Sequence, residues 1–165
     1  MNVKIKLLSA EAKIPTKAHS TDACFDIYAC EPDAVYPDAV YREWNGGLEI
    51  KEVNGLKIRP HETVKIHTGF ATEIPVGYYA AVYARSGLST KQGLRPANCV
   101  GVIDAAFRGE WIVALHNDSS ETRIVKHGDR IAQFAVLPVL DIKLEESNEL
   151  NSTERGTGGF GSSGV

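Results

Sequence analysis

The chain has 165 residues, of which 43% are apolar and 24% charged, and its formal net charge is −3. These values fit one globular domain with a buried core. The basic residues form no cluster, which argues against binding to duplex nucleic acid, and no segment approaches the ~20 apolar residues of a membrane span.

Short alternating or apolar stretches predict β-strands along most of the chain. In order, the predicted strands are Lys4–Leu7, Phe25–Ala29, Thr63–Phe70, Tyr78–Ala84, Cys99–Ile103, Trp111–Leu115 and Arg130–Val139. Turn sequences separate them, and the one predicted helix is short, from Ser86 to about Gln92. Many short strands with regular turns favour an all-β sandwich or barrel.

Residues 37–58 have the composition of an inserted β-arm. Asn45-Gly46-Gly47 and Asn54-Gly55 are tight-turn sequences, and the second lies between EIKEV and LKI, which predicts a hairpin there. We expect residues 1–142 to form the domain. Residues 143–165 would be a flexible polar tether that ends in a glycine-rich tail.

Cysteines and histidines give no sign of a disulfide framework or a metal site. The three cysteines have no CxxC spacing, and the five histidines no paired metal spacing. We interpret the histidines as surface or structural residues and the cysteines as reduced thiols. Because the N-terminus lacks the apolar run of a secretory signal, we expect a cytoplasmic protein, or one of the host-cell cytoplasm if the source is viral.

The stretch from Gly101 to Glu110 places a carboxylate, Asp104, after an apolar strand. Burial moves the pKa of such an acid toward neutrality, as a general base requires, but an aspartate that caps a turn occupies the same position. Phe107 is either a core side chain or a ring on which a flat or sugar-like ligand rests. Asn98 places a polar amide shortly before the acid.

Two further stretches carry polar groups at the ends of strands. In ARSGLS, Ser86 is either the N-cap of the helix or, with Arg85, part of a phosphate site at the helix start. In GDRIAQF, Gln133 is either an outward side chain of an edge strand or a member of a site. The residues alone leave these alternatives open.

The last eleven residues, RGTGGFGSSGV, combine a glycine-rich backbone with one guanidinium and one aromatic ring. They form either a disordered terminus or a lid. Glycine N–H groups can approach a polyanion without obstruction, Arg155 adds charge, and Phe160 can stack on a planar base. Such a lid would order only when the site is filled.

Taken together and in order, five stretches resemble the motifs of the trimeric dUTP pyrophosphatase (dUTPase) family. They are AHSTDACFDIYA, ARSGLS, NCVGVIDAAFRGE, GDRIAQF and RGTGGFGSSG. The resemblance spans nearly the whole chain apart from residues 37–58. It implies a jelly-roll-like β-barrel in a homotrimer with shared active sites. It also implies hydrolysis of dUTP to dUMP and pyrophosphate, which keeps uracil out of DNA and supplies dUMP for thymidylate synthesis.

The resemblance further implies a role for each matched residue. Asp104 would orient and deprotonate the water that attacks the α-phosphorus, and Asp26 would lie near the waters of a Mg²⁺ ion. That ion would be held by substrate phosphates and waters, without a direct protein ligand. The implied substrate-binding residues are Arg85, Ser86, Gly87, Asn98, Gly101, Val102, Ile103, Phe107, Gln133, Arg155, Gly156, Thr157, Gly158, Phe160, Gly161 and Ser162.

Within that set, phosphates would be bound by Arg85 to Gly87, Gln133 and Arg155. A hairpin that begins at Asn98 would read the uracil edge, and Phe160 would stack on the base. Two positions depart from the family pattern: Cys24 replaces a usual glycine, and Phe107 replaces a usual tyrosine under the deoxyribose. Phenylalanine keeps the ring face, so discrimination against the 2′-hydroxyl should persist.

Two other functions compete with this interpretation. A dCTP deaminase of the same fold needs a catalytic glutamate on the strand after the aspartate, where this chain has Ala114. A non-enzymatic regulator would bind a protein partner through the 37–58 arm. The retained Asp104, Arg85 and Gln133 favour an enzyme, although the arm could still bind a partner.

Overall fold

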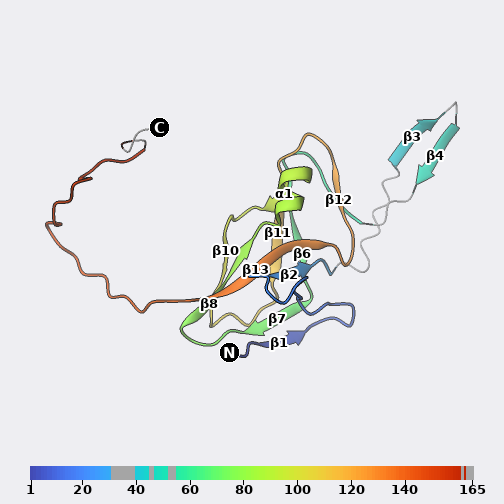
Figure 1. Ribbon diagram of the computed structural model, residues 1–165. Coiled ribbons are helices and arrows are strands. Elements are labelled where there is room, and N and C mark those ends of the chain that lie inside the picture. The colour runs from blue at the N-terminus through green and yellow to red at the C-terminus, as the bar shows by residue number, and fades with distance from the viewer. Residues whose placement is uncertain (31–39, 45–46, 52–54, 161, 163–165) are drawn as a thin grey trace.

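The computed structural model describes the whole chain except residues 31–39, 45–46, 52–54, 161 and 163–165 (Figure 1). The described part contains one short helix, α1 (Ser86–Gln92). Its strands are β1 (Lys4–Leu7), β2 (Phe25–Tyr28), β3 (Val40–Trp44), β4 (Gly47–Lys51), β5 (Leu56–Ile58), β6 (Thr63–His67), β7 (Phe70–Glu73), β8 (Tyr78–Tyr83), β9 (Leu94–Pro96), β10 (Gly101–Ile103), β11 (Ile112–Asn117), β12 (Arg123–Val125) and β13 (Arg130–Pro138).

These strands pair antiparallel in a four-stranded sheet, β10-β8-β13-β2, a three-stranded sheet, β6-β11-β9, and the pairs β1-β7, β12-β5 and β3-β4. The prediction of a mostly β chain is therefore confirmed. The described strands do not close into a barrel, so the jelly-roll-like barrel stays a prediction. In this part of the chain, no helix is long and apolar enough to cross a membrane.

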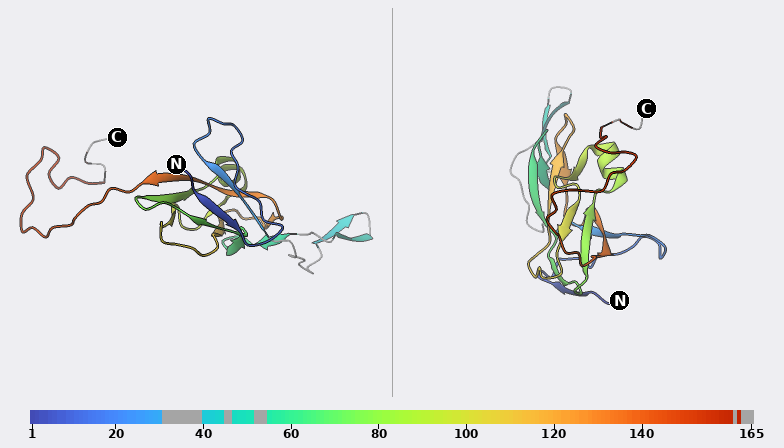
Figure 2. Two further views of the ribbon diagram at one scale, coloured as in Figure 1. Left: turned by 90° about the horizontal axis from the view of Figure 1, so that it is seen from below. Right: turned by 90° about the vertical axis from the view of Figure 1, so that its left-hand side faces the viewer.

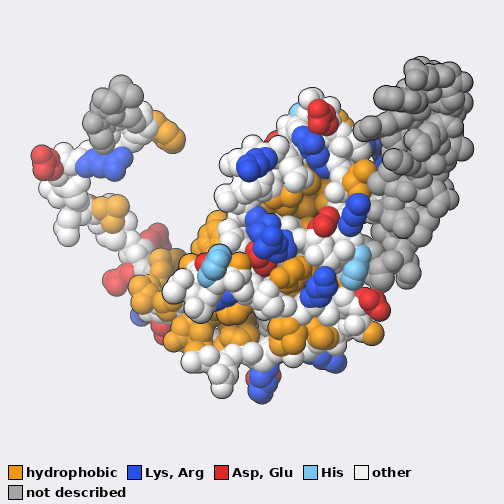
Figure 3. Space-filling model, turned by 45° about the vertical axis from the view of Figure 1, so that its right-hand side comes forward, with side chains coloured by type: hydrophobic (Ala, Val, Ile, Leu, Met, Phe, Trp, Pro, Cys, Tyr) orange, Lys and Arg blue, Asp and Glu red, His pale blue; other side chains and the backbone are white. Residues whose placement is uncertain are grey.

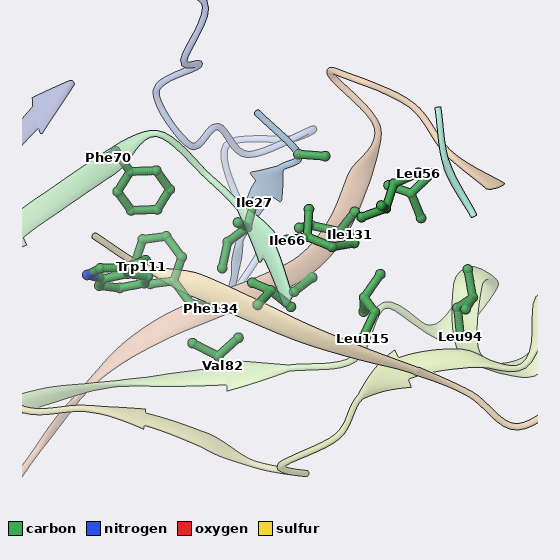
Figure 4. Close-up of a cluster of buried hydrophobic side chains, with 14 of the residues drawn as sticks. Ile27, Leu56, Ile66, Phe70, Val82, Leu94, Trp111, Leu115, Ile131 and Phe134 are labelled. Carbon is green, nitrogen blue, oxygen red and sulfur yellow. The ribbon is translucent and has the colours of Figure 1, made fainter. Parts of the chain in front are cut away.

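The hydrophobic core draws side chains from both larger sheets (Figure 4). Trp111 packs against two other aromatic rings: its ring lies 5.1 Å from that of Phe70 and 4.9 Å from that of Phe134, measured between centroids. On β11, alternate residues turn inward, and Val113 and Leu115 are buried. This packing fixes the relative placement of the sheets whose strand ends carry the polar residues.

The predicted strand Thr63–Phe70 is two strands, β6 and β7, because the chain turns at Gly69. This residue has φ of 70°, and a Cβ there would lie 2.6 Å from the Cβ of Ala12 and 2.8 Å from the Sγ of Cys30. Only glycine fits both the backbone angle and the space. Strands β9 and β12, of three residues each, were not predicted because they are too short for alternation to reveal them.

The arm prediction is partly wrong. Strands β3 and β4 pair with each other, from Val40 opposite Lys51 to Trp44 opposite Gly47. Within the described residues, β4 and β5 do not pair with each other as the hairpin predicted at Asn54-Gly55 requires. Strand β5 pairs with β12 instead. A Cβ at Gly55 would lie 2.7 Å from Cγ2 of Ile124, so this glycine permits a close approach to β12. Residues 37–39, 45–46 and 52–54 of the arm lie outside the described residues.

The C-terminal segment after β13 runs away from the sheets on the side opposite to β3 and β4 (Figures 1 and 2). Its apolar side chains are exposed, including Leu140 and Leu144 at 81% and 88%. The side chains of this segment therefore do not contribute to the hydrophobic core.

Candidate active site

Two strands, β2 and β13, and the start of α1 bring three polar side chains together around Asp26. This residue lies on β2 and is only 9% exposed. One of its carboxylate oxygens accepts a hydrogen bond from Nε of Arg85 at 2.7 Å, and the other accepts one from Nη1 of Arg130 at 3.1 Å. Gln133 lies opposite Asp26 on β13 and donates from Nε2 to the backbone oxygen of Ala84 at 2.9 Å. We call Asp26, Arg85, Arg130 and Gln133 the arginine cluster.

Charge-assisted bonds to both oxygens of one carboxylate fix the two guanidiniums with respect to each other. Beside them is a cavity of about 250 Å³ lined by Arg85, Arg130, Asp129 and apolar side chains of α1, β9, β12 and β13. Figure 3 shows basic and acidic side chains next to one another over the body, with apolar side chains between them. The cluster therefore offers two oriented cations at the edge of a hollow.

Sequence reasoning missed Arg130, although it lies within GDRIAQF. The sequence feature that could have identified Arg130 is its place at the start of the predicted strand that also carries Gln133. The alternative interpretation of Gln133 as an edge-strand residue is wrong, because β13 lies between β8 and β2. Strand order depends on long-range pairing, which this heptapeptide does not encode.

The start of α1 differs from the predicted N-cap. The N-cap is Arg85, with extended backbone and no side-chain cap hydrogen bond, and Ser86 is the first helical residue. The side chain of Ser86 is exposed, and a Cβ at Gly87 would have no atom within 4 Å. The helix start is therefore accessible.

Asp104 is exposed immediately after β10. Strand β10 is an edge strand of the four-stranded sheet. Of the three residues that lead to the acid, Gly101 is buried and Val102 is exposed. Asp104 was expected to be buried, but within a single chain its carboxylate is exposed to solvent.

The turn after Asp104 is held by its own side chains. Nη1 of Arg108 donates to the backbone oxygens of Ala105 at 2.5 Å and Phe107 at 2.9 Å. The ring of Phe107 is 42% exposed and lies over Gly109, where a Cβ would be 2.7 Å from Cζ of the ring. Phe107 is thus not a core residue, and Gly109 makes room for its ring.

The acid and the arginine cluster lie at opposite ends of β8. Ile103, the residue before Asp104, pairs with Ala80, whereas Arg85 follows the far end of this strand. At ~3.3 Å per residue, about 20 Å of strand separates the two positions. One chain therefore does not bring Asp104 to the arginines.

The segment predicted as a uracil-reading hairpin is not a paired hairpin. Strand β9 pairs with β11 and β10 with β8, so residues 97–100 form a loop that connects two sheets. We call it the connecting loop. Asn98 is exposed on it, and a cavity of about 40 Å³ beside it is lined by Asn98, Gly101, Val102 and Ile103 among others. A Cβ at Gly101 would lie 3.3 Å from Nδ2 of Asn98.

The tail makes local contacts far from these groups. Nε of Arg155 donates to the backbone oxygen of Gly158 at 2.9 Å, and the ring of Phe160 is fully exposed. Gly156 has φ of 53°, and Thr157 is exposed like its neighbour Gly156. A Cβ at Gly158 would lie 2.8 Å from Oγ of Ser162. Gly161 lies outside the described residues, and closure of the tail stays a prediction.

Glu110, an ionisable group outside these sites, has structural partners. Partial burial raises the pKa of Glu110, but hydrogen bonds from Nδ1 of His67 and the N–H of Gly69, both at 2.8 Å, outweigh it and lower that pKa overall. The ionised Glu110 thus ties the end of β6 to the segment before β11. The three cysteines, which all lie within the described residues, form no disulfide. Among the described residues, no group of three His, Cys, Asp or Glu could hold a metal ion.

The fold and these groups define a mostly β protein whose polar site is divided between distant strand ends. The dUTPase family model matches residues 40–164, and the chain belongs to this family. A deoxyuridine 5′-triphosphate nucleotidohydrolase of Desulfitobacterium hafniense is 53% identical over 67% of this chain and 74% of the relative. One of a Hydrogenobaculum species is 37% identical over 100% of this chain and 99% of the relative.

Solved structures agree with the family. A mutant dUTPase of Staphylococcus bacteriophage 80alpha with dUpNHpp is 27% identical, has a TM-score of 0.78, and is matched over 99% of both chains. A mutant dUTPase of phage phi11 of S. aureus shares the fold at 23% identity and a TM-score of 0.71, over 92% of this chain and 100% of that one. That structure is described as revealing the coordination of a structural Mg(II) ion.

Proposed function

We propose that the protein hydrolyses dUTP to dUMP and pyrophosphate at a site that neighbouring subunits complete for one another. The reaction follows from family membership, and the observation that carries it is the 37% identity to a deoxyuridine 5′-triphosphate nucleotidohydrolase over the whole chain. The residue roles proposed below rest on the geometry of the arginine cluster, the connecting loop and Asp104.

The arginine cluster is proposed as the phosphate site. The bond from Arg85 to Asp26 uses Nε, so its two Nη groups can bind phosphate oxygens in a fixed orientation. The accessible Ser86 hydroxyl and the open backbone at Gly87 add donors, and Gln133 adds an amide. Fixed donors suit phosphoryl transfer because they stabilise charge without reorganising during the reaction.

Asp104 is proposed as the general base that orients and deprotonates the attacking water. Because this acid and the arginine cluster lie at opposite ends of β8, we propose that a site combines the cluster of one subunit with Asp104 of a neighbour. Such a contact would also cover the exposed carboxylate, as the chemistry requires. The tail, whose described residues lie apart from both, would close the site from a further subunit.

The connecting loop is proposed to read the base. Uracil presents an acceptor–donor–acceptor edge, which Asn98 and the backbone of Gly101 to Ile103 can match. Cytosine would leave buried groups unpaired, and a loop that fits closely around uracil would clash with the 5-methyl of thymine. A deaminase role is disfavoured because Ala114 stands where that reaction needs an acid on β11.

The donor set fits a Mg²⁺ ion that arrives with the substrate. Both oxygens of Asp26 already accept from arginines, so this carboxylate could contact waters of the ion but is not free to be a ligand. Triphosphate oxygens and waters would supply the ligands, as Mg²⁺ prefers. When bound, the ion would neutralise charge on the phosphates.

Pyrophosphate release from dUTP tests this function. We expect release with Mg²⁺ in the buffer, none after EDTA is added, and recovery when Mg²⁺ is restored in excess. Substitution of dCTP should give neither pyrophosphate at a comparable rate nor ammonia. Intact dUTP after incubation with Mg²⁺, or ammonia from dCTP, would contradict the proposal.

Sugar selectivity tests the role of Phe107. We expect kcat/KM for dUTP to exceed that for UTP by at least about tenfold, because a ring face under the deoxyribose leaves no room for a 2′-hydroxyl. Phe107→Ala should reduce this ratio toward one, and Phe107→Tyr should preserve it. Equal kcat/KM values for dUTP and UTP in the unmodified protein would show that Phe107 does not select the sugar.

A further inference from the structure

We infer that Arg95 and Cys99 are positioning residues for base recognition: together they clamp the connecting loop in the shape that Asn98 needs to bind uracil. The inference rests on the proposed dUTP hydrolysis and on the proposed role of that loop. In this role, neither Arg95 nor Cys99 contacts the substrate.

The loop needs such a clamp because its two flanking strands do not pair with each other. Strand β9 belongs to the three-stranded sheet and β10 to the four-stranded sheet. In an ordinary hairpin, the ladder between the strands fixes the geometry of the turn. Here residues 97–100 span from one sheet to the other, so their shape depends on other contacts.

Arg95 and Cys99 supply those contacts across the loop. Nη1 of Arg95 donates to Sγ of Cys99 at 3.0 Å and to the backbone oxygen of Pro96 at 3.3 Å. The thiol of Cys99 in turn donates to the same Pro96 oxygen at 2.8 Å. A guanidinium, a thiol and a carbonyl thus link the last residue of β9 with the third residue of the loop. Asn98, next to Cys99, is held between them.

The clamp has a rigid support on β11 and the turn that follows it. Nε and Nη2 of Arg95 bind the two carboxylate oxygens of Asp118 at 2.5 and 3.2 Å. The hydrogen bond from Arg95 lowers the pKa of Asp118, so this partner is ionised at neutral pH. The preceding residue, Asn117, is fully buried and donates to the backbone oxygens of Ile58 and Glu121. The two-point bond therefore ties the loop to a fixed part of the core.

The position of the clamp predicts which kinetic constant it controls. The clamp acts on Asn98 before β10, whereas Asp104 follows the end of that strand and is separated from the loop by residues paired with β8. Loss of the clamp should therefore weaken the binding of the base and leave the chemical step almost unchanged. Loss of a residue that only supports the fold would not raise KM while leaving kcat unchanged.

The test compares Arg95→Gln, Cys99→Ala and Cys99→Ser with a matched control, Arg123→Gln. Like Arg95, Arg123 donates to a backbone oxygen, in this case that of Gln92 from Nε, and pairs with a carboxylate, that of Glu121. We expect Arg95→Gln and Cys99→Ala to raise KM for dUTP about tenfold, with kcat within about twofold, as the loss of one or two hydrogen bonds predicts. Cys99→Ser should stay near the unmodified value because a hydroxyl can donate to Pro96. Arg123→Gln should leave KM unchanged.

Hydrogen exchange measured without nucleotide gives an independent readout. Amides of residues 97–101 should exchange faster in Arg95→Gln and Cys99→Ala than in the unmodified protein, but not in Arg123→Gln.

Unchanged KM for dUTP together with unchanged amide exchange in these variants would overturn the clamp. So would equal losses of kcat and melting temperature in Arg95→Gln and Arg123→Gln. If the unmodified protein left dUTP intact, the proposed function would fail, whereas the exchange data would still decide whether the clamp exists. If Arg95→Gln fails to fold, the comparison of Cys99→Ala with Cys99→Ser, both at an exposed position, still tests the clamp.

Discussion

Replacement of Asp104 by asparagine is expected to lower kcat for pyrophosphate release from dUTP by at least ~100-fold, the scale of a positioned general base. Asparagine keeps the size of the side chain but cannot accept the proton of the attacking water. Since the carboxylate is exposed at the end of an edge strand, its loss should leave no hole in the core. The melting temperature should therefore stay within a few degrees of the unmodified value.

A control variant, Glu121→Gln, removes an exposed acid of similar surface character that pairs only with Arg123 among the described ion pairs. We expect it to keep full activity. Direct binding of a non-hydrolysable dUTP analogue separates chemistry from affinity in the Asp104 variant: binding should persist while turnover is lost. Turnover within a few-fold of the unmodified protein would exclude Asp104 as the base.

The sequence allowed local features to be predicted well. The bounds of β1 and α1 agree to the residue, and β2, β8 and β13 agree to within one residue at each end. Alternation, β-branched residues and a glycine after the helix determine these elements locally. Asp26 and Gln133 were assigned to one site through resemblance, and their register on β2 and β13 places them side by side.

Features that depend on long-range pairing could not be predicted. The Asn54-Gly55 sequence indicated a hairpin, but β12, some 70 residues further on, pairs with β5 instead. The family resemblance implied a hairpin at the connecting loop, and only the partners of β9 and β10 show that this loop joins two sheets. The carboxylate of Asp104 was expected to be buried because its strand is apolar, but an edge strand exposes one face. In each case strand pairing between residues far apart in the sequence decided the outcome.

Removal of residues 155–165 is expected to lower kcat/KM for dUTP about 100-fold, because Arg155 and Phe160 would no longer position the substrate. The fold should be unaffected: Phe160 is fully exposed, and Arg155 bonds only within the tail among the described contacts. Urea unfolding should therefore coincide for the full and shortened chains. Equal kcat/KM for both would show that the tail has no part in the reaction.

Mixing two inactive variants tests whether the tail acts on a neighbouring subunit. The shortened chain keeps Asp104 but lacks the tail, and the full-length Asp104→Asn chain has the tail but lacks the base. If Asp104 and the tail of one site come from different chains, the hybrid oligomers that the proposed function implies would, after joint refolding, contain sites with both groups intact, and activity should reappear. Separately refolded variants mixed afterwards serve as the control and should stay inactive. No recovery in the hybrids would mean that Asp104 and the tail of each site belong to the same chain.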